Sequence, residues 1–210
     1  MMAVSGLFFV FYVLVHMYGN LKILAGHQGF DDYAHHLRVL GEPILPYTGM
    51  LWIFRILLIV AVIAHAYSAF KLWGRAGSAR SQKYAAKSTV KASLSSKTMR
   101  WGGVALLLFV IFHILHFTLR AVPMPAYTGS PAAMVVAGFQ NPLILIIYTL
   151  AMIALAMHLH HGVWSACQTL GLTNTAKSRG LAKAAGMIVA VVVAVGFLIP
   201  PFAIALRFIQ

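Results

Sequence analysis

Five long apolar stretches constrain this chain more than any other feature of its sequence. Each has about the 20 residues that a helix needs to cross a hydrocarbon core of about 30 Å, where the backbone must satisfy its own hydrogen bonds. Of the 210 residues, 61% are hydrophobic and 9% are charged, whereas soluble domains carry about 25% charged residues. We therefore predict an all-α integral membrane protein, one domain over residues 1–210 with five transmembrane helices. The expected spans are residues 3–24, 52–73, 101–121, 143–167 and 186–208.

The charged residues are distributed unevenly between the loops that join these spans. All three acidic residues lie between the first and second spans, and eight of the sixteen Lys and Arg residues lie between the second and third. Because cytoplasmic loops carry the excess of Lys and Arg, we expect a protein of the cell membrane with its N-terminus in the cytoplasm and its C-terminus outside. The eight basic residues are Lys71, Arg75, Arg80, Lys83, Lys87, Lys91, Lys97 and Arg100.

This basic loop contributes much of the formal net charge of +13. Orientation in the lipid bilayer explains the loop without any ligand, and docking of an acidic cytoplasmic partner is the alternative. Basic patches also attract nucleic acid. Since the charge here follows the orientation rule, we expect no nucleic-acid partner.

Three connecting segments have distinct compositions. Residues 30–41, FDDYAHHLRVLG, have the pattern of a short amphipathic helix at the outer surface. Residues 122–134, VPMPAYTGSPAAM, are punctuated by Pro and Gly and predict an external turn. Residues 76–98 are rich in Ser, Ala and Lys and predict a flexible or marginally helical loop.

Seven of the ten histidines lie inside the predicted spans, where an imidazole is costly unless something occupies its ring nitrogens. A single one is most simply a hydrogen-bonded core residue or a residue that lines a cavity. Four histidine-bearing helices in one small bundle instead favour a shared ligand. The seven are His16, His65, His113, His116, His158, His160 and His161.

Depth separates these histidines into two levels. Three of them lie six or seven residues before a basic residue that marks a membrane face, which is roughly 9–10 Å at about 1.5 Å per residue. With the predicted orientation, the first and third spans place their histidines near the outer face, and the second and fourth near the cytoplasmic face. The two levels are then roughly 10 Å apart in a core of about 30 Å. The three pairs are His16 and Lys22, His65 and Lys71, and His113 and Arg120.

Two histidines at each level match the axial ligands of two stacked b-type haems. Zinc needs about four ligands close together, and non-haem iron needs a carboxylate that no span contains. Haem supplies four nitrogens of its own, and the absence of a C-x-x-C-H sequence makes its attachment non-covalent. With both axial positions filled, electron transfer is favoured over oxygen chemistry. Depth favours His113 over His116 but leaves the ligand in the fourth span open, because His158 and His161 are i,i+3 neighbours.

Four sequence segments resemble the di-haem cytochrome b membrane subunit of succinate:quinone oxidoreductases, in its five-helix single-chain form. They are VHMYGN (15–20), AHAYSAF (64–70), FHILHF (112–117) and MHLHHGVWSACQTLG (157–171). The resemblance implies that His16 and His113 bind the outer haem iron and that His65 and His158 bind the cytoplasmic one. It also implies a flavoprotein subunit and an iron–sulfur subunit docked on the cytoplasmic face, and electron transfer from succinate through two haems b to a membrane quinone. We expect menaquinone rather than ubiquinone.

One departure from the resemblance concerns protons. Some relatives carry a carboxylate just ahead of the fourth-span ligand, but residues 155–157 are Leu-Ala-Met here. A proton route that depends on such a carboxylate is therefore not expected. Glu42, in the first external loop, is the acidic residue placed for proton exchange with a quinone near the outer haem, with capping of its own loop as the alternative.

Five basic residues lie near the predicted haem levels. A buried carboxylate needs a charged or hydrogen-bonding partner, so these residues are candidates to neutralise haem propionates. Plain anchoring at the membrane interface is the alternative for each of them. The outer candidates are Lys22, Arg55 and Arg120, and the cytoplasmic candidates are Lys71 and Arg75.

Three other functions compete with this interpretation. The chain could serve a quinol:fumarate reductase, or be the cytochrome b of a hydrogenase or formate dehydrogenase. A transporter or proton channel with a histidine relay is the third possibility. Against a transporter, the spans contain no acidic residue and no Gly/Pro interruptions at matching midplane positions.

Overall fold

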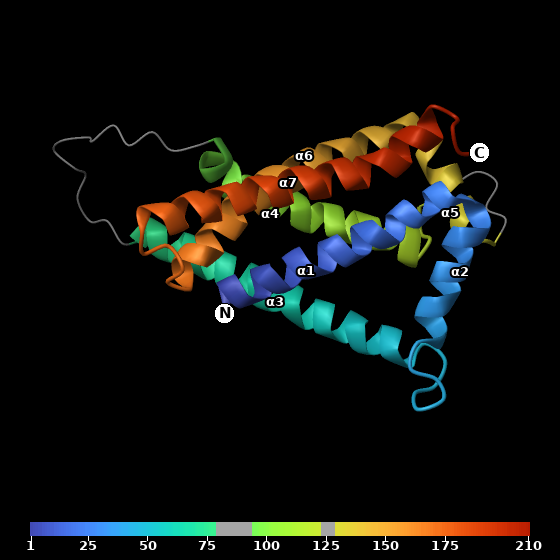
Figure 1. The fold of residues 1–210 in the computed structure, drawn as a ribbon, viewed down its shortest axis with the longest axis horizontal. Helices are drawn as coiled ribbons and strands as arrows, with labels where there is room; N and C mark the ends of the chain where they lie inside the picture. The colour runs from blue at the N-terminus through green and yellow to red at the C-terminus, as the bar shows by residue number, and fades with distance from the viewer. Residues whose placement is uncertain (79–93, 123–128) are drawn as a thin grey trace.

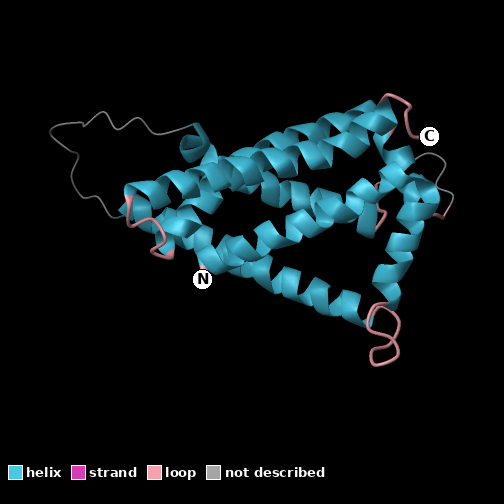
Figure 2. Ribbon diagram, viewed as in Figure 1, coloured by secondary structure: helices cyan, strands magenta, loops and turns pink. Residues whose placement is uncertain are grey.

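The computed structural model describes residues 1–78, 94–122 and 129–210, and in these ranges the chain forms helices joined by turns, with no strand (Figure 2). Five of the described segments are long and apolar enough to cross a membrane: Met2–Val39, Gly49–Ala76, Leu94–Thr118, Pro142–Thr169 and Ala176–Ala205. The predicted all-α membrane bundle is confirmed. Its helices are α1 (Met2–Leu21), α2 (Gly26–Val39), α3 (Gly49–Ser78), α4 (Leu94–His113), α5 (Pro131–Phe139), α6 (Pro142–Thr169) and α7 (Ala176–Ala205).

The long helices run along the molecule, and the short helices α2 and α5 lie at one end of it, which we call the α2 end (Figure 1). The other end, which holds the N-terminus, is called the N-terminal end. Helices α6 and α7 lie side by side, and α1 packs against both of them and against α3. Helices α1 and α4 run towards the α2 end, whereas α3 and α6 run away from it.

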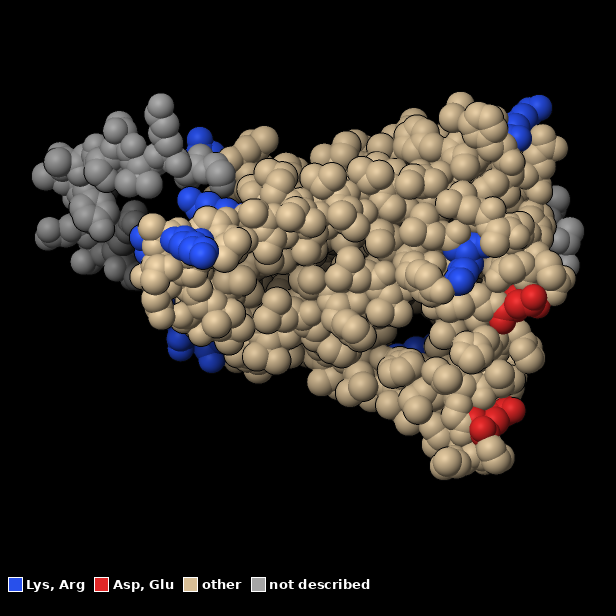
Figure 3. Space-filling view, viewed as in Figure 1, with Lys and Arg blue, Asp and Glu red and all other residues tan. Residues whose placement is uncertain are grey.

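The surface of the bundle is apolar along its length and charged at its ends. Ile56, Ile59 and Ile63 form a stripe on α3, and each is more than half exposed (55%, 53% and 62%). Such a stripe suits a lipid environment and would be unusual in water. On the face shown in Figure 3, Asp and Glu side chains lie at the α2 end and most Lys and Arg side chains at the N-terminal end.

Helix α7 packs through small residues. Gly186, Ala190 and Gly196 are buried on the side that faces the other helices. Lipid supplies no hydrophobic driving force between helices, so membrane bundles depend on close van der Waals packing through such residues. Helix α7 bears no histidine. Its close contact with α6 and α1 helps to set the positions of the histidines on those two helices.

The segment 122–134 differs from its prediction, because residues from Pro131 onward begin helix α5. Ser130 caps this helix, and its hydroxyl donates a hydrogen bond to the carboxylate of Asp31 on α2. The same carboxylate accepts a hydrogen bond of 2.8 Å from the backbone N–H of Ala132. Ser followed by Pro occurs both at helix starts and in turns, and the sequence prediction assigned it to a turn. Residues 123–128 of the predicted turn lie outside the described residues.

The other two connections can be compared only in part. The predicted amphipathic helix at residues 30–41 is present as α2, although it begins four residues earlier, at Gly26. Of the predicted loop at residues 76–98, the last five residues belong to α4, which begins at Leu94. Residues 79–93 lie outside the described residues.

The packing of α7 predicts unequal effects of two Gly→Ala substitutions. A Cβ atom at Gly186 would lie 2.7 Å from the backbone oxygen of His160, which cannot move without shifting α6. A Cβ atom at Gly196 would overlap the Sδ atom of Met17, which is the movable end of a flexible side chain. We expect Gly186→Ala to destabilise the protein by about 1–3 kcal/mol, the usual range for overpacking, and Gly196→Ala to have a smaller effect.

Thermal unfolding of the full-length protein in detergent measures this difference. Gly180→Ala is a matched control, because a Cβ atom at Gly180 would meet nothing within 4 Å. Equal unfolding temperatures for the variants at Gly186 and Gly196 would contradict the packing described here.

Candidate functional site

Four histidines from four different helices meet in two pairs. The ring centres of His16 on α1 and His113 on α4 are 5.8 Å apart, with an angle of 81° between the ring planes. Those of His65 on α3 and His158 on α6 are 6.1 Å apart, with an angle of 61°. The depth argument placed His16 and His113 at one level and His65 with the fourth-span histidines at the other, and the resemblance singled out His158 among the latter. We call the first the α1–α4 pair and the second the α3–α6 pair.

The spacing within each pair suits two ligands on opposite sides of one metal ion. An imidazole–metal bond is about 2 Å long and each nitrogen lies about 1 Å from its ring centre, so two such rings have centres roughly 6 Å apart. Both observed spacings are close to this value. All four imidazoles are only partly covered by the rest of the chain.

Two glycines give the distance between the pairs. A Cβ atom at Gly6 of α1 would lie 3.4 Å from Cε1 of His65, and one at Gly103 of α4 would lie 3.5 Å from Cε1 of His158. Helix α1 thus passes the α3–α6 pair at Gly6 and reaches the other pair ten residues later, at His16. Helix α4 repeats this interval from Gly103 to His113. Ten residues span about 15 Å along a helix.

This separation is larger than the roughly 10 Å predicted from depth. The prediction took Lys22 and Lys71 to mark the edges of the hydrocarbon core. With the larger separation between the pairs, we expect these two residues slightly beyond the edges, in the headgroup region where Lys side chains are stable.

The rings of the paired histidines have different polar and aromatic neighbours. Nδ1 of His65 lies 3.2 Å from the hydroxyl of Ser5, and Nδ1 of His113 lies 3.1 Å from that of Tyr148. His16 stacks on Tyr12, with ring centres 5.4 Å apart. Metal-binding histidines commonly hold their other nitrogen in such a hydrogen bond, which leaves Nε2 for the metal. His65 and His113 have this arrangement.

His158 provides a direct test of whether a bound group fits. Its Nδ1 is buried and has no hydrogen-bond partner among the described residues. A buried polar atom without a partner costs about 1–3 kcal/mol, so each such atom needs an explanation. This imidazole faces His65 at 6.1 Å, and a group outside the chain that bound Nδ1 itself would account for the orphaned atom, whereas His65 and His113 leave Nε2 for such a group. The donor set of two imidazoles at each level also fits haem, which needs only axial ligands from the protein.

The remaining histidines of the spans lie outside both pairs. His116 is fully buried, and its Nδ1 lies 3.0 Å from the hydroxyl of Tyr148. Nδ1 of His160 lies 3.2 Å from the hydroxyl of Ser95, and His161 is partly buried on the same helix. In the described ranges, no group of three or more His, Cys, Asp or Glu side chains is placed to hold a bare metal ion.

Three of the five basic residues considered for propionate binding lie over aromatic rings. The charged group of Lys22 is 4.6 Å from the ring centre of Tyr18, that of Arg55 is 4.9 Å from Trp52, and that of Lys71 is 5.5 Å from Tyr67. Cation–π contacts beside exposed aromatic rings are typical of anchoring at a membrane interface. Propionate binding by these three residues, and by Arg75 and Arg120, stays a prediction.

Glu42 lies apart from both pairs. It is exposed in the turn of residues 40–48, and its backbone N–H donates to the carbonyl of Val39 at 3.0 Å. Figure 1 places this turn beyond the start of α3, at the corner of the α2 end away from α4. Its role in proton exchange therefore rests on the sequence argument and stays a prediction.

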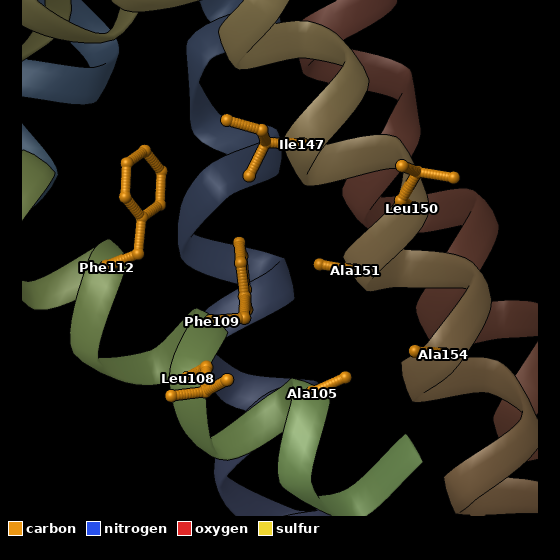
Figure 4. Close-up of a pocket in the computed structure, with 8 residues that line it drawn as sticks. All are labelled: Ala105, Leu108, Phe109, Phe112, Ile147, Leu150, Ala151 and Ala154. Atoms are coloured by element: carbon orange, nitrogen blue, oxygen red, sulfur yellow. The ribbon is translucent and has the colours of Figure 1, made fainter. Parts of the chain in front are cut away.

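An apolar groove between α4 and α6 was not predicted from the sequence. It encloses about 350 Å³ and reaches the surface at Leu108 and Leu150, which are exposed. Figure 4 shows Phe109 and Ala151 directed into it from opposite sides. Alanines and leucines at helical spacing are equally typical of helix packing, so no sequence signal marks such a groove. Its lining is Ala105, Leu108, Phe109, Phe112, Ile147, Leu150, Ala151 and Ala154.

The comparisons with known proteins identify the family. Residues 71–198 match the family described as succinate dehydrogenase/fumarate reductase transmembrane subunit. This match spans more than half of the chain and includes two of the four paired histidines, His113 and His158. The other two, His16 and His65, precede the matched segment, and His116, His160 and His161 lie within it. No curated protein and no solved structure matched the chain. The chain therefore belongs to the family of succinate dehydrogenase/fumarate reductase transmembrane subunits.

Proposed function

We propose that this chain is the haem-binding, quinone-reactive membrane anchor of a succinate:quinone oxidoreductase. The observation that carries the proposal is the pairing of four imidazoles from four helices, at spacings of 5.8 Å and 6.1 Å. Such pairs suit two haems b, one above the other. When bound, each haem supplies a one-electron carrier, and two haems about 15 Å apart along the helices provide a path across much of the membrane.

The chain's own residues bind and orient in this proposal. His16 and His113 hold the haem near the α2 end, and His65 and His158 hold the haem near the N-terminal end. Two imidazoles at each level would serve as the ligands of a bound haem, which would then act in electron transfer and not in oxygen chemistry.

The N-terminal end is the proposed docking face for an iron–sulfur subunit and its flavoprotein partner. Most Lys and Arg side chains on the face in Figure 3 lie at this end, which the orientation rule assigns to the cytoplasm. In this arrangement His65 and His158 would hold the haem on the side of the iron–sulfur subunit, and His16 and His113 would hold the haem on the side of a membrane quinone at the outer face. Menaquinone remains the quinone we propose, and succinate oxidation the direction.

The family assignment sets aside two of the competing functions. A cytochrome b of a hydrogenase or formate dehydrogenase and a proton-conducting transporter are both inconsistent with membership in this family. A quinol:fumarate reductase uses the same parts in the opposite direction and is the second candidate, since the family includes both enzymes.

Replacing one histidine of each pair tests the proposal. We expect His16→Ala to remove the haem near the α2 end and His65→Ala to remove the one near the N-terminal end, because each haem loses an axial ligand. Pyridine haemochrome analysis of the purified complex should then give one haem per chain in place of two. His161→Ala is the control, since His161 lies on α6 outside both pairs and should leave both haems in place. Two haems in both test variants would refute the ligand assignment.

Glu42 is tested separately from the haems. If its carboxylate exchanges protons with a quinone at the outer face, Glu42→Gln should lower quinone reduction and leave succinate oxidation with an artificial acceptor intact. Asp32→Asn is the matched control, because Asp32 is an acidic residue at the same end that hydrogen-bonds Gln28 at 2.6 Å. Unchanged quinone reduction in Glu42→Gln would remove Glu42 from the site.

A further inference from the structure

Tyr148 joins two histidines that lie one turn apart on another helix. Its hydroxyl oxygen lies 3.1 Å from Nδ1 of His113 and 3.0 Å from Nδ1 of His116. Directly after His113 the chain forms a π-helical turn, Ile114–Thr118, in which the N–H of Leu119 donates to the carbonyl of Ile114 at 2.8 Å. Turns of this kind are rare and are frequent at functional sites.

Aromatic rings enclose this cluster. Tyr148 is 7% exposed and His116 is fully buried. The rings of Phe109 and Phe139 each lie 5.0 Å from that of Tyr148 in edge-to-face contact. A phenol in such apolar surroundings is neutral and carries one proton, so its hydrogen bonds can be counted.

The count fixes the tautomer of at least one histidine. The phenol can donate its proton to only one of the two Nδ1 atoms, so the other contact is a hydrogen bond only if that Nδ1 carries the proton itself. A neutral imidazole protonated at Nδ1 has its lone pair on Nε2, which is the form that binds a metal. The cluster therefore holds at least one imidazole in the ligand form before any metal arrives.

The position of His16 indicates which imidazole that is. Its ring faces His113 at 5.8 Å, whereas His116 stacks on Phe112 with ring centres 5.6 Å apart. We propose that Tyr148 is a positioning residue: it accepts a hydrogen bond from Nδ1 of His113, donates its own proton to Nδ1 of His116, and so presents Nε2 of His113 as the axial ligand. This inference rests on the proposed function, because it needs a haem at the α1–α4 pair.

The hydrogen bond also sets the electronic character of the ligand. An acceptor on Nδ1–H makes the imidazole more basic, and a more basic ligand stabilises ferric over ferrous iron. Removing the acceptor should therefore raise the midpoint potential of the haem bound by His113. His116 strengthens the acceptor by taking the phenol proton, so its removal should shift the potential in the same direction by a smaller amount.

Tyr148→Phe is the main test, because it removes the hydroxyl and keeps the aromatic ring. We expect the purified complex to retain two haems, with a higher midpoint potential and changed ferric electron paramagnetic resonance g-values for the haem of the α1–α4 pair. The haem of the α3–α6 pair should not change. Assignment of the two signals follows from the variants at His16 and His65. Tyr12→Phe is the matched control, since Tyr12 stacks on His16 through its ring, which the substitution keeps.

His116→Leu and the double variant complete the test. If His113, Tyr148 and His116 act through one series of hydrogen bonds, the haem potential of the double variant should equal that of Tyr148→Phe, because the second substitution removes no further hydrogen bond to His113. Two independent, additive shifts would overturn the proposed series. Selective loss of the α1–α4 haem from Tyr148→Phe, with the other haem retained, would support positioning by the hydroxyl.

Separate outcomes distinguish this inference from the proposed function. Two haems with unchanged potentials in Tyr148→Phe would overturn the role of Tyr148 and leave the proposed function standing. A wild-type complex without haem at the α1–α4 pair would overturn the proposed function first. If Tyr148→Phe does not accumulate in the membrane, His116→Leu decides the matter, and an unchanged potential in that variant would overturn the inference.

Discussion

An imidazole surrounded by apolar helices must find partners for two ring nitrogens, and lipid provides none. Much of this bundle follows from that constraint. His65 and His113 each turn Nδ1 towards a hydroxyl group, and His158 has a buried Nδ1 for which the described residues supply no partner. The helices that carry these residues are mostly apolar along their middle stretches. Polar atoms are few there, and the histidine pairs are the places where we propose that haem binds.

Helix α7 and the cap formed by α2 and α5 have supporting roles. Small residues let α7 approach α6 so closely that the space beside Gly186 admits no methyl group. Asp31 ties α2 to the start of α5 through Ser130 and the N–H of Ala132. Neither feature contributes a ligand. Both fix the directions of the helices that do, and a shift of about 1 Å in a ligand is enough to disturb a metal site.

Hydropathy and histidine depth predicted the bundle and the grouping of His16 with His113, because both depend on position along a helix. The same reasoning could not find Tyr148, whose partners come from a different helix and depend on the π-helical turn after His113. Nor could it find α5, since a Ser-Pro sequence such as Ser130–Pro131 is common both in turns and at helix starts. The prediction for Glu42 used only its acidity and its place in an external loop, but the turn that holds it lies at a corner away from α4. Sequence composition does not show at which corner of the bundle a loop lies.

The pairing of the histidines has a consequence for how the protein is assembled in the membrane. Each pair joins the first hairpin of long helices, α1 and α3, to the second, α4 and α6. Neither hairpin contains a complete pair, so during synthesis no site exists until both hairpins have been inserted and have associated. A group bound between them then connects the two halves of the chain at two depths. Binding of that group would then add to the direct packing of α1 against α6 and α7 in holding the two halves together.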